Sequence, residues 1–110
     1  MTKKASPNIG YVYVLTRRDI PQPHLSVQVG HAAIAATNTF GNPRVTHPNL
    51  VVCALDNEEQ LEGAFNRLKE SGVPCCAWYE EDMDNRMTAI ATGIIHGADR
   101  KHFRKFKLLN

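Results

Sequence analysis

The sequence predicts one α/β domain in which a mixed four-stranded sheet carries helices on both faces, giving three layers, α/β/α. Two observations lead to this prediction. Short uncharged runs rich in strand-forming residues, such as residues 11–15 and 50–55, alternate with two amphipathic helical segments. The chain of 110 residues is also close to the usual size of one domain, so a single domain spanning residues 1–110 is expected.

Each expected element is bounded by residues that start or stop it. Pro23 suits the start of the first helix, whose apolar stripe repeats at helical spacing until Gly41. In the second helix, Asp56 fits the N-cap, and Gly72 fits the left-handed position after the last turn. The expected strands are residues 11–15, 50–55, 73–79 and 87–95, and the expected helices are residues 24–40 and 57–71.

The connections predict how the strands pair. A strand–helix–strand connection favours parallel pairing, whereas the short acidic link at residues 80–85 allows the last two strands to be antiparallel. Residues 98–108 are expected to form a short basic helix followed by an extended tail. Residues 1–9 are expected to be flexible.

The composition favours a folded protein of the cytoplasm. Hydrophobic residues make up 43% of the chain and charged residues 22%, a balance that argues against extensive disorder. No apolar run approaches the ~20 residues that a membrane-spanning helix needs, so no membrane partner is expected.

The three cysteines, Cys53, Cys75 and Cys76, are expected to be reduced and partly buried, and the adjacent pair is expected to point to opposite faces of its strand.

Charge is segregated along the chain. The net charge is +2, but residues 1–55 carry +4, residues 56–84 carry −7 and residues 85–110 carry +5. Such segregation can present one positive face to a polyanion, although blocks of charge are also typical of ordinary solvated surfaces. The residues expected to contact RNA are Arg17, Arg18, Lys101, Arg104 and Lys105.

The C-terminal segment 100–107 combines five cations with two aromatic rings. Phosphates and stacked bases are bound by sets of this kind. Alternatively, Phe103 and Phe106 dock on the core while the cations remain in water. The two interpretations are compatible with each other.

A polar stripe lies at the start of the first helix. His24, Gln28 and His31 are spaced at i, i+4 and i+7, so they share one helix face directly after a strand, where open α/β sheets often bind ligands. The helix N-terminus there also favours an anion such as phosphate. The alternative is a set of surface side chains without a role. The two histidines lack the i, i+4 spacing of a zinc helix, and no metal or cofactor is expected.

Several short motifs occur in an order typical of a known family. They are Gln-Val-Gly-His-Ala-Ala at residues 28–33, Gly-Val-Pro at 72–74, Thr-Ala-Ile-Ala-Thr-Gly at 88–93 and Lys-Leu-Leu at 107–109. Each fragment is common, but their order and spacing resemble the peptidyl-tRNA hydrolase 2 family of archaea and eukaryotes. The resemblance extends from about residue 11 to residue 109.

This resemblance implies a hydrolase of translation that cleaves the ester bond between peptide and tRNA and releases the tRNA for reuse. It also implies tRNA as partner and a homodimer. Within such a site, His24 and Gln28 would donate hydrogen bonds, His31 would orient a neighbour or act as a base, Glu80 would accept, and the Thr88 hydroxyl would hold a water. His31 can instead be a helix histidine bonded into the sheet, and Thr88 an ordinary strand residue.

The sequence also departs from the family pattern. His24 stands where the family usually has lysine, which removes a permanent cation. The family's Asp-Ala-Gly triplet is replaced by Glu80-Glu81-Asp82, so either Glu80 or Glu81 can supply the acidic group. These departures leave a second hypothesis open, a catalytically inactive or repurposed hydrolase-like domain that binds tRNA or protein.

Overall fold

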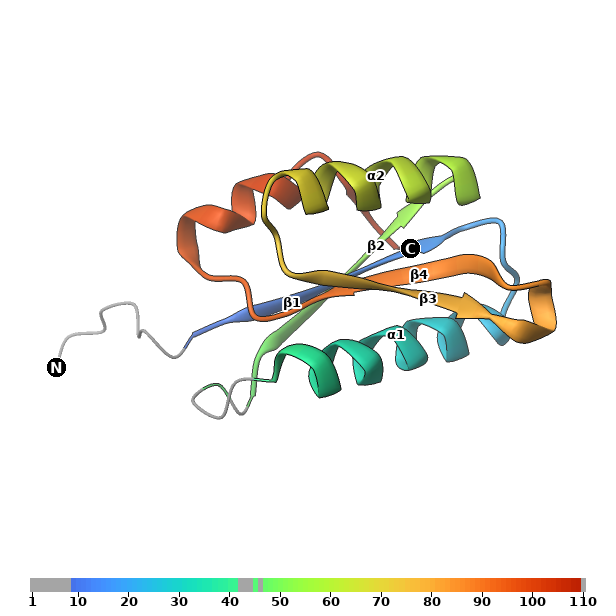
Figure 1. The fold of residues 1–110 in the computed structure, drawn as a ribbon, viewed down its shortest axis with the longest axis horizontal. Helices are drawn as coiled ribbons and strands as arrows, with labels where there is room; N and C mark the ends of the chain where they lie inside the picture. The colour runs from blue at the N-terminus through green and yellow to red at the C-terminus, as the bar shows by residue number, and fades with distance from the viewer. Residues whose placement is uncertain (1–8, 42–44, 46, 110) are drawn as a thin grey trace, which may run out of the picture.

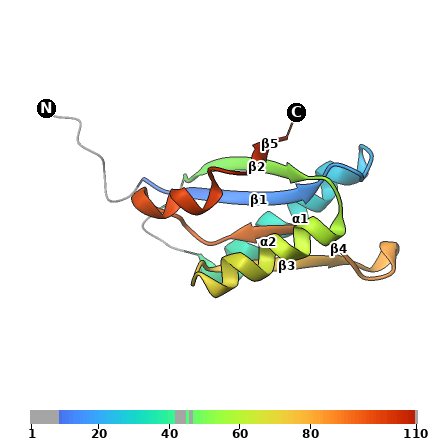
Figure 2. The ribbon, with the colours of Figure 1, turned by 90° about the horizontal axis from the view of Figure 1, so that it is seen from above.

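Five strands form one mixed sheet in the computed structural model, which describes residues 9–41, 45 and 47–109. The α/β class, the mixed sheet and the central place of the first strand are confirmed. The flexibility expected for residues 1–9 concerns mainly residues 1–8, which lie outside the described part of the chain. The strands are β1 (Tyr11–Arg17), β2 (Asn49–Leu55), β3 (Cys75–Glu80), β4 (Arg86–Thr92) and β5 (Lys107–Leu108). Their order in the sheet is β3-β4-β1-β2-β5 (Figure 1 and Figure 2; β5 is labelled in Figure 2).

The strand pairing follows the lengths of the connections. β1 pairs with β2 in parallel and with β4 antiparallel, and β3 pairs antiparallel with β4. The predicted number of four strands was wrong, because Lys107 and Leu108 pair with Ala54 and Cys53 at the edge of β2 and form a fifth strand. Two residues are too few to show the alternation that identifies a strand, so the sequence indicates only an extended tail there.

Two α-helices and two 3-10 helices complete the described fold. Gly72, after the second α-helix, has a φ of +79°, as its predicted left-handed position requires. The predicted N-cap was wrong by one residue, since Asn57 rather than Asp56 caps this helix and accepts a hydrogen bond from the Gln60 N–H at 2.9 Å. None of the helices in the described residues is long and apolar enough to span a membrane. The helices are α1 (His24–Phe40), α2 (Glu58–Glu70), η1 (Glu81–Met83) and η2 (Gly97–Phe103).

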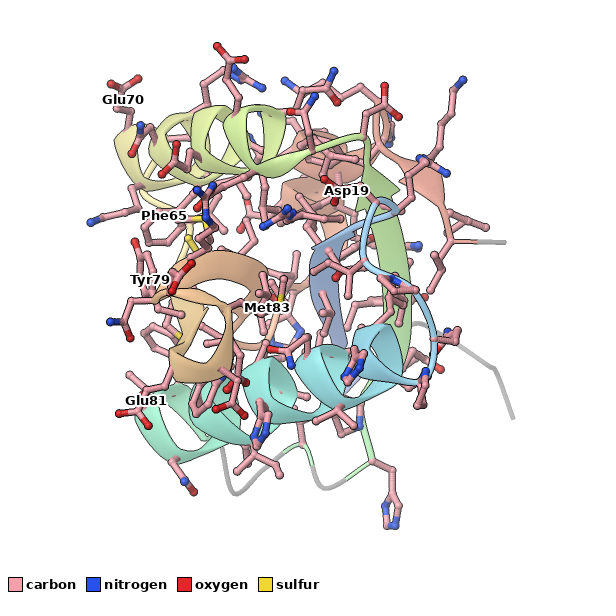
Figure 3. The ribbon with its side chains drawn as sticks, turned by 90° about the vertical axis from the view of Figure 1, so that its right-hand side faces the viewer. Asp19, Phe65, Glu70, Tyr79, Glu81 and Met83 are labelled. Atoms are coloured by element: carbon pink, nitrogen blue, oxygen red, sulfur yellow. The ribbon has the colours of Figure 1, made fainter. Side chains whose placement is uncertain are left out.

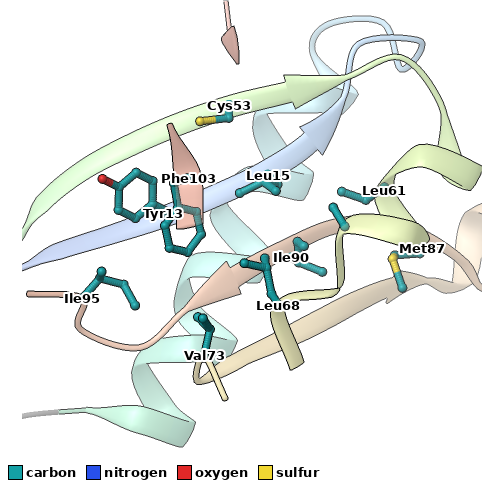
Figure 4. Packing of buried hydrophobic residues seen from close by; sticks show 11 residues of the cluster. Tyr13, Leu15, Cys53, Leu61, Leu68, Val73, Met87, Ile90, Ile95 and Phe103 are labelled. Carbon is teal, nitrogen blue, oxygen red and sulfur yellow. The ribbon is translucent and has the colours of Figure 1, made fainter. Parts of the chain in front are cut away.

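The larger hydrophobic cluster lies between the sheet and α2 (Figure 4). Phe103 of η2 stacks on Tyr13 of β1 with 4.0 Å between ring centroids, so the predicted docking of this aromatic residue on the core is confirmed. The thiol of Cys53 is buried within the cluster and free. The best-buried members of the cluster are Leu15, Leu61, Ala64, Ile90 and Cys53.

A second cluster, made mostly of alanines, lies between the sheet and α1. Small side chains on both elements allow the helix to approach the strands closely. At Gly93, a Cβ atom would lie only 2.8 Å from the Cβ of Phe40 at the end of α1, so the packing leaves no room for a side chain there. Figure 1 shows α1 and α2 on opposite sides of the sheet. The buried members of this cluster are Val14, Ala32, Ala36, Ala89 and Ala91.

The fold gathers three segments at one end of the sheet. The carboxyl end of β1, the start of α1 and the β3–β4 connection lie together at the right of Figure 1, and η2 lies at the opposite end in both Figure 1 and Figure 2. Arg17 holds the end of β1 to the start of β4, because its Nη1 donates to the Met87 carbonyl at 3.1 Å. The loop that leads to α1 therefore starts from a fixed point.

Candidate active site

A cleft of about 360 Å³ lies where the start of α1 meets the β3–β4 connection. Four residues predicted to be catalytic line it, namely His24, Gln28, His31 and Glu80. Figure 3 looks onto this end of the molecule and shows Met83 on the connection, above α1. The remaining lining residues are Ile20, Pro21, Val27, Asp82 and Met83.

Gln28 is fixed in the floor of this cleft. Its side chain is buried, and the Thr88 hydroxyl donates a hydrogen bond to its Oε1 at 2.7 Å. Because the amide oxygen is occupied in this way, the NH₂ group is left to face the Glu80 carboxylate, and it lowers the pKa of that group. Thr88, the fifth predicted residue, thus contacts the site from behind and has its hydroxyl fully buried.

A β-bulge in β4 explains why Thr88 reaches α1. Trp78 of β3 pairs with Ala89, but the next residue, Tyr79, pairs with Met87, so Thr88 has no partner in the ladder. Both Thr88 and Ala89 therefore point toward α1, although neighbours in a regular strand point to opposite faces. The Thr88 carbonyl is fixed as well, since it accepts a hydrogen bond from a neighbouring strand, from the Thr16 hydroxyl at 2.9 Å.

The Glu80 carboxylate receives hydrogen bonds from several directions. The Trp78 indole N–H donates to its Oε1 at 3.3 Å, and the Asp82 backbone N–H donates to its Oε2 at 3.4 Å. These two bonds, the Gln28 amide and the electrostatic influence of nearby His31 lower the pKa of Glu80 from its usual value. Of the acidic residues at 80–82, Glu80 and Asp82 line the cleft, whereas Glu81 is exposed outside it.

His31 lies flat against Trp78. The centroids of the two rings are 4.6 Å apart, and their planes differ by 9°. The stack fixes the plane of the imidazole and places it beside Glu80, which Trp78 also contacts. Trp78 is a site residue that the sequence did not single out. Its signal is weak, since a lone tryptophan in a strand is usually part of the core.

Three backbone amides at the start of α1, where the sequence favours an anion, already have partners within the protein. The Ser26 N–H donates to the Gln22 Oε1 at 3.2 Å, and the N–H groups on either side of it donate to the carbonyls of Pro21 and Pro23. These amides are occupied within the protein and cannot also bind a phosphate. His24 itself is exposed at the rim of the cleft.

The two arginines at the end of β1 are both engaged within the protein. Arg17 is 8% exposed, and its Nε and Nη2 bond both carboxylate oxygens of Asp19 at 2.9 and 3.1 Å. Arg18 is more accessible, but it bonds Asp56 at 3.1 Å and the Ala54 carbonyl at 2.7 Å. Arg17 is thus a buried structural residue, and Arg18 is the one that a polyanion can reach.

The predicted RNA-binding residues near the C-terminus fall into two places. Lys105 lines an open cleft of about 750 Å³ together with Arg18, at the end of the sheet where β1 and β2 finish. Lys101 lies on η2, at the far end of the molecule from the candidate active site (Figure 1). Lys101, Arg104 and Lys105 are all exposed, and no ion pair involves them within the described residues.

The role of Thr88 can be tested with valine, which keeps the shape of threonine and lacks the hydroxyl. In Thr88→Val, the buried Oε1 of Gln28 loses its donor, so the free energy of unfolding should fall by about 1–3 kcal/mol. Urea denaturation measures this change. The matched control, Thr39→Val, removes an exposed hydroxyl from α1 and should change the value by less than about 0.5 kcal/mol. Equal losses in the two variants would contradict the proposed role.

The environment of Glu80 predicts a specific titration. Its carboxyl group should titrate below the usual glutamate value of ~4.3, as followed by NMR of the side-chain carboxyl carbon. Trp78→Phe removes the indole N–H, the largest cause of the lowered pKa, and should raise the pKa. Because the folded pKa is depressed, the ionised group stabilises the fold above the unfolded pKa, and this contribution is lost as the pH falls through the folded pKa. A wild-type pKa at or above the usual value would refute the described contacts.

Comparisons with known proteins bear on the fold alone. No protein-family model matches the chain, and no curated protein matches it. Among similar solved structures is a protein of unknown function from Agrobacterium tumefaciens strain C58, with 17% sequence identity and a TM-score of 0.58. The match covers 92% of this chain and 98% of that one. The chain therefore shares the overall fold of that protein.

Proposed function

We propose that this protein is a peptidyl-tRNA hydrolase-like carboxylic ester hydrolase, which cleaves the ester between peptide and tRNA. One observation carries the proposal. The Gln28 amide, the His31 imidazole and the Glu80 carboxylate line a single cleft, and buried Thr88 fixes the amide from behind. A donor, a base and an acceptor held together are what ester hydrolysis requires.

The geometry favours a particular division of roles. A lowered pKa makes Glu80 a weak base, so we assign proton removal from the attacking water to His31, with the Glu80 carboxylate stabilising the imidazolium that forms. Gln28 has a second amide hydrogen, which would stabilise the negative charge on the carbonyl oxygen. The bond from the acyl carbon to the ribose oxygen then breaks, and that oxygen takes the proton from His31.

Two of the predicted roles change in this scheme. Thr88 becomes a positioning residue for Gln28, because its buried hydroxyl is already donated to the amide. For tRNA, we assign Arg18 and Lys105 to the phosphates nearest the cleft and Lys101 and Arg104 to more distant ones, and we leave buried Arg17 out.

We also take the domain as the three-layer α/β/α type, which the separate clusters beneath α1 and α2 support.

A second candidate function is a hydrolase-like domain that binds tRNA or protein without chemistry. The observation that favours it is the absence of lysine and arginine among the residues described as lining the cleft, where the resembling family usually keeps a lysine. His24 occupies that position as the exposed first residue of α1. Turnover distinguishes the two hypotheses.

The hydrolase proposal predicts the effects of three substitutions. On an N-acylaminoacyl-tRNA, Gln28→Ala and His31→Ala should each lower kcat/KM by ~10²-fold, because each removes a preorganised group that acts in the transition state. His24→Lys should raise the rate by restoring a permanent cation. Single-turnover release of free tRNA measures these rates. Asn38→Ala on the exposed end of α1 and Glu81→Gln beside the cleft are controls that should keep the wild-type rate.

Circular dichroism must first show that every variant is folded. Rates near background for the wild-type protein and for all well-folded variants would exclude the hydrolase and leave the binding domain. A wild-type rate that Gln28→Ala and His31→Ala do not change would instead place the chemistry outside this cleft.

The assignment of tRNA-binding residues predicts a change in salt dependence. Charge reversal at Arg104 and Lys105 should weaken tRNA binding and reduce the slope of log K against log salt by about 1 for each phosphate that the variant no longer binds. Fluorescence anisotropy over a series of salt concentrations measures both quantities. Lys69→Glu, on the exposed surface of α2, is the matched control and should leave the slope unchanged. If the charge-reversal variant at Arg104 and Lys105 binds tRNA with the same affinity and the same salt slope as the wild-type protein and Lys69→Glu, the assigned surface is refuted.

A further inference from the structure

The charge of the candidate cleft is negative. Among the described residues that line it, Glu80 and Asp82 are acidic and none is lysine or arginine. The hydrogen bonds that lower the pKa of Glu80 also favour its ionised form at neutral pH. A cleft of this charge attracts cations and repels anions.

A helix N-terminus can bind an anion where cationic side chains are absent, but most of its backbone amides are occupied here. The N–H groups of residues 25–27 at the start of α1 already donate to Gln22 and to carbonyls of the preceding loop. Neither a cationic side chain nor a free row of backbone amides therefore marks a phosphate subsite in the described lining of this cleft. The phosphates of tRNA have to be bound elsewhere, on the side of Arg18 and Lys105.

The rest of the cleft lining is partly apolar. Ile20, Pro21, Val27 and Met83 contribute hydrocarbon surface, and Met83 directly follows Asp82 on η1. Val27 is 51% exposed, so part of this surface is open to a ligand. A ligand that fits this mixed acidic and apolar lining has aliphatic carbons next to a positively charged group. That description matches an acyl group better than a nucleotide.

We propose that the cleft is an acyl subsite selecting esters whose acyl group carries an ammonium beside apolar carbons. The inference rests on the proposed hydrolase function and names its substrate class. Asp82 is the residue that determines this specificity, because the Glu80 oxygens are engaged by donors of the protein itself. The Asp82 carboxylate lines the cleft and is exposed, and no ion pair involves it among the described residues.

Two sources can supply such an ammonium. One is the free α-amino group of an aminoacyl ester with an apolar side chain. The other is the ε-amino group of lysine as the last residue of a peptidyl ester, whose methylenes would lie along Val27 and Met83. Leucyl-tRNA and Nα-acetyl-lysyl-tRNA represent the two sources, and N-acetyl-leucyl-tRNA is the neutral reference.

The test compares these three esters in the wild-type protein, in Asp82→Asn and in the control Asp84→Asn. Asp84 is an exposed acid on the same connection and does not line the cleft, and asparagine tolerates its φ of 57°. The wild-type kcat/KM should be about fivefold higher for at least one cationic ester than for the neutral one, the scale of an exposed ion pair. Asp82→Asn should abolish this ratio, and Asp84→Asn should keep it.

A binding experiment separates this inference from the failure of the hydrolase proposal. Leucinamide, Nα-acetyl-lysinamide and the neutral N-acetyl-leucinamide are titrated into ¹⁵N-labelled protein, and the shifts of the Gln28 side-chain amide report binding without turnover. Tighter binding of a cationic amide that depends on Asp82 supports the subsite even if no ester is hydrolysed. Equal binding of all three amides, or a preference that survives Asp82→Asn, overturns it whether or not the esters are turned over.

Discussion

The hydrogen bond from the Thr88 hydroxyl to Gln28 joins the sheet to the helix that carries the candidate site. It connects residues 60 positions apart and is fully buried, so competition from water is weak. The bond depends on the bulge in β4, which turns Thr88 toward α1. Without this hydrogen bond, Gln28 would be a buried amide with no fixed orientation, and its NH₂ group would not be aimed at Glu80.

The other contacts of the site follow from this arrangement. The Gln28 amide faces Glu80. Glu80 accepts a hydrogen bond from the Trp78 indole N–H, and the Trp78 ring stacks on His31. Each side chain thus has a neighbour that limits its freedom, as expected of groups that have to act together. Val27 and Asp82 line the same cleft and are exposed, which suits residues that select a ligand rather than act on it.

Much of the fold could be predicted from the sequence, because it depends on local patterns. The bounds of α1 agree with its apolar stripe, and Gly72 ends α2 as its freedom at positive φ predicts. The two-residue strand β5 could not be predicted, because only pairing with β2 defines it. The stripe of His24, Gln28 and His31 identified the cleft, since helical spacing alone places these residues on one face.

The remaining features of the site depend on contacts between distant residues. No spacing rule reveals that β4 contains a bulge, that Trp78 lies under His31, or that Arg17 is buried against the Met87 carbonyl. Arg17 and Arg18 are adjacent residues of the same type, yet Arg17 is buried and Arg18 is exposed. For the same reason, the charge of a segment did not show which of its cations are accessible.

The stacking of Trp78 on His31 has a spectroscopic consequence. The chain contains a single tryptophan, and that residue lies within the candidate site and donates its indole N–H to Glu80. A protonated imidazole in contact with an indole quenches its emission, and a change in the polarity around the ring shifts the emission wavelength. The tryptophan emission of this protein, excited selectively over that of its three tyrosines, therefore comes from one place. It reports the charge of His31 and the occupancy of the cleft without any added label.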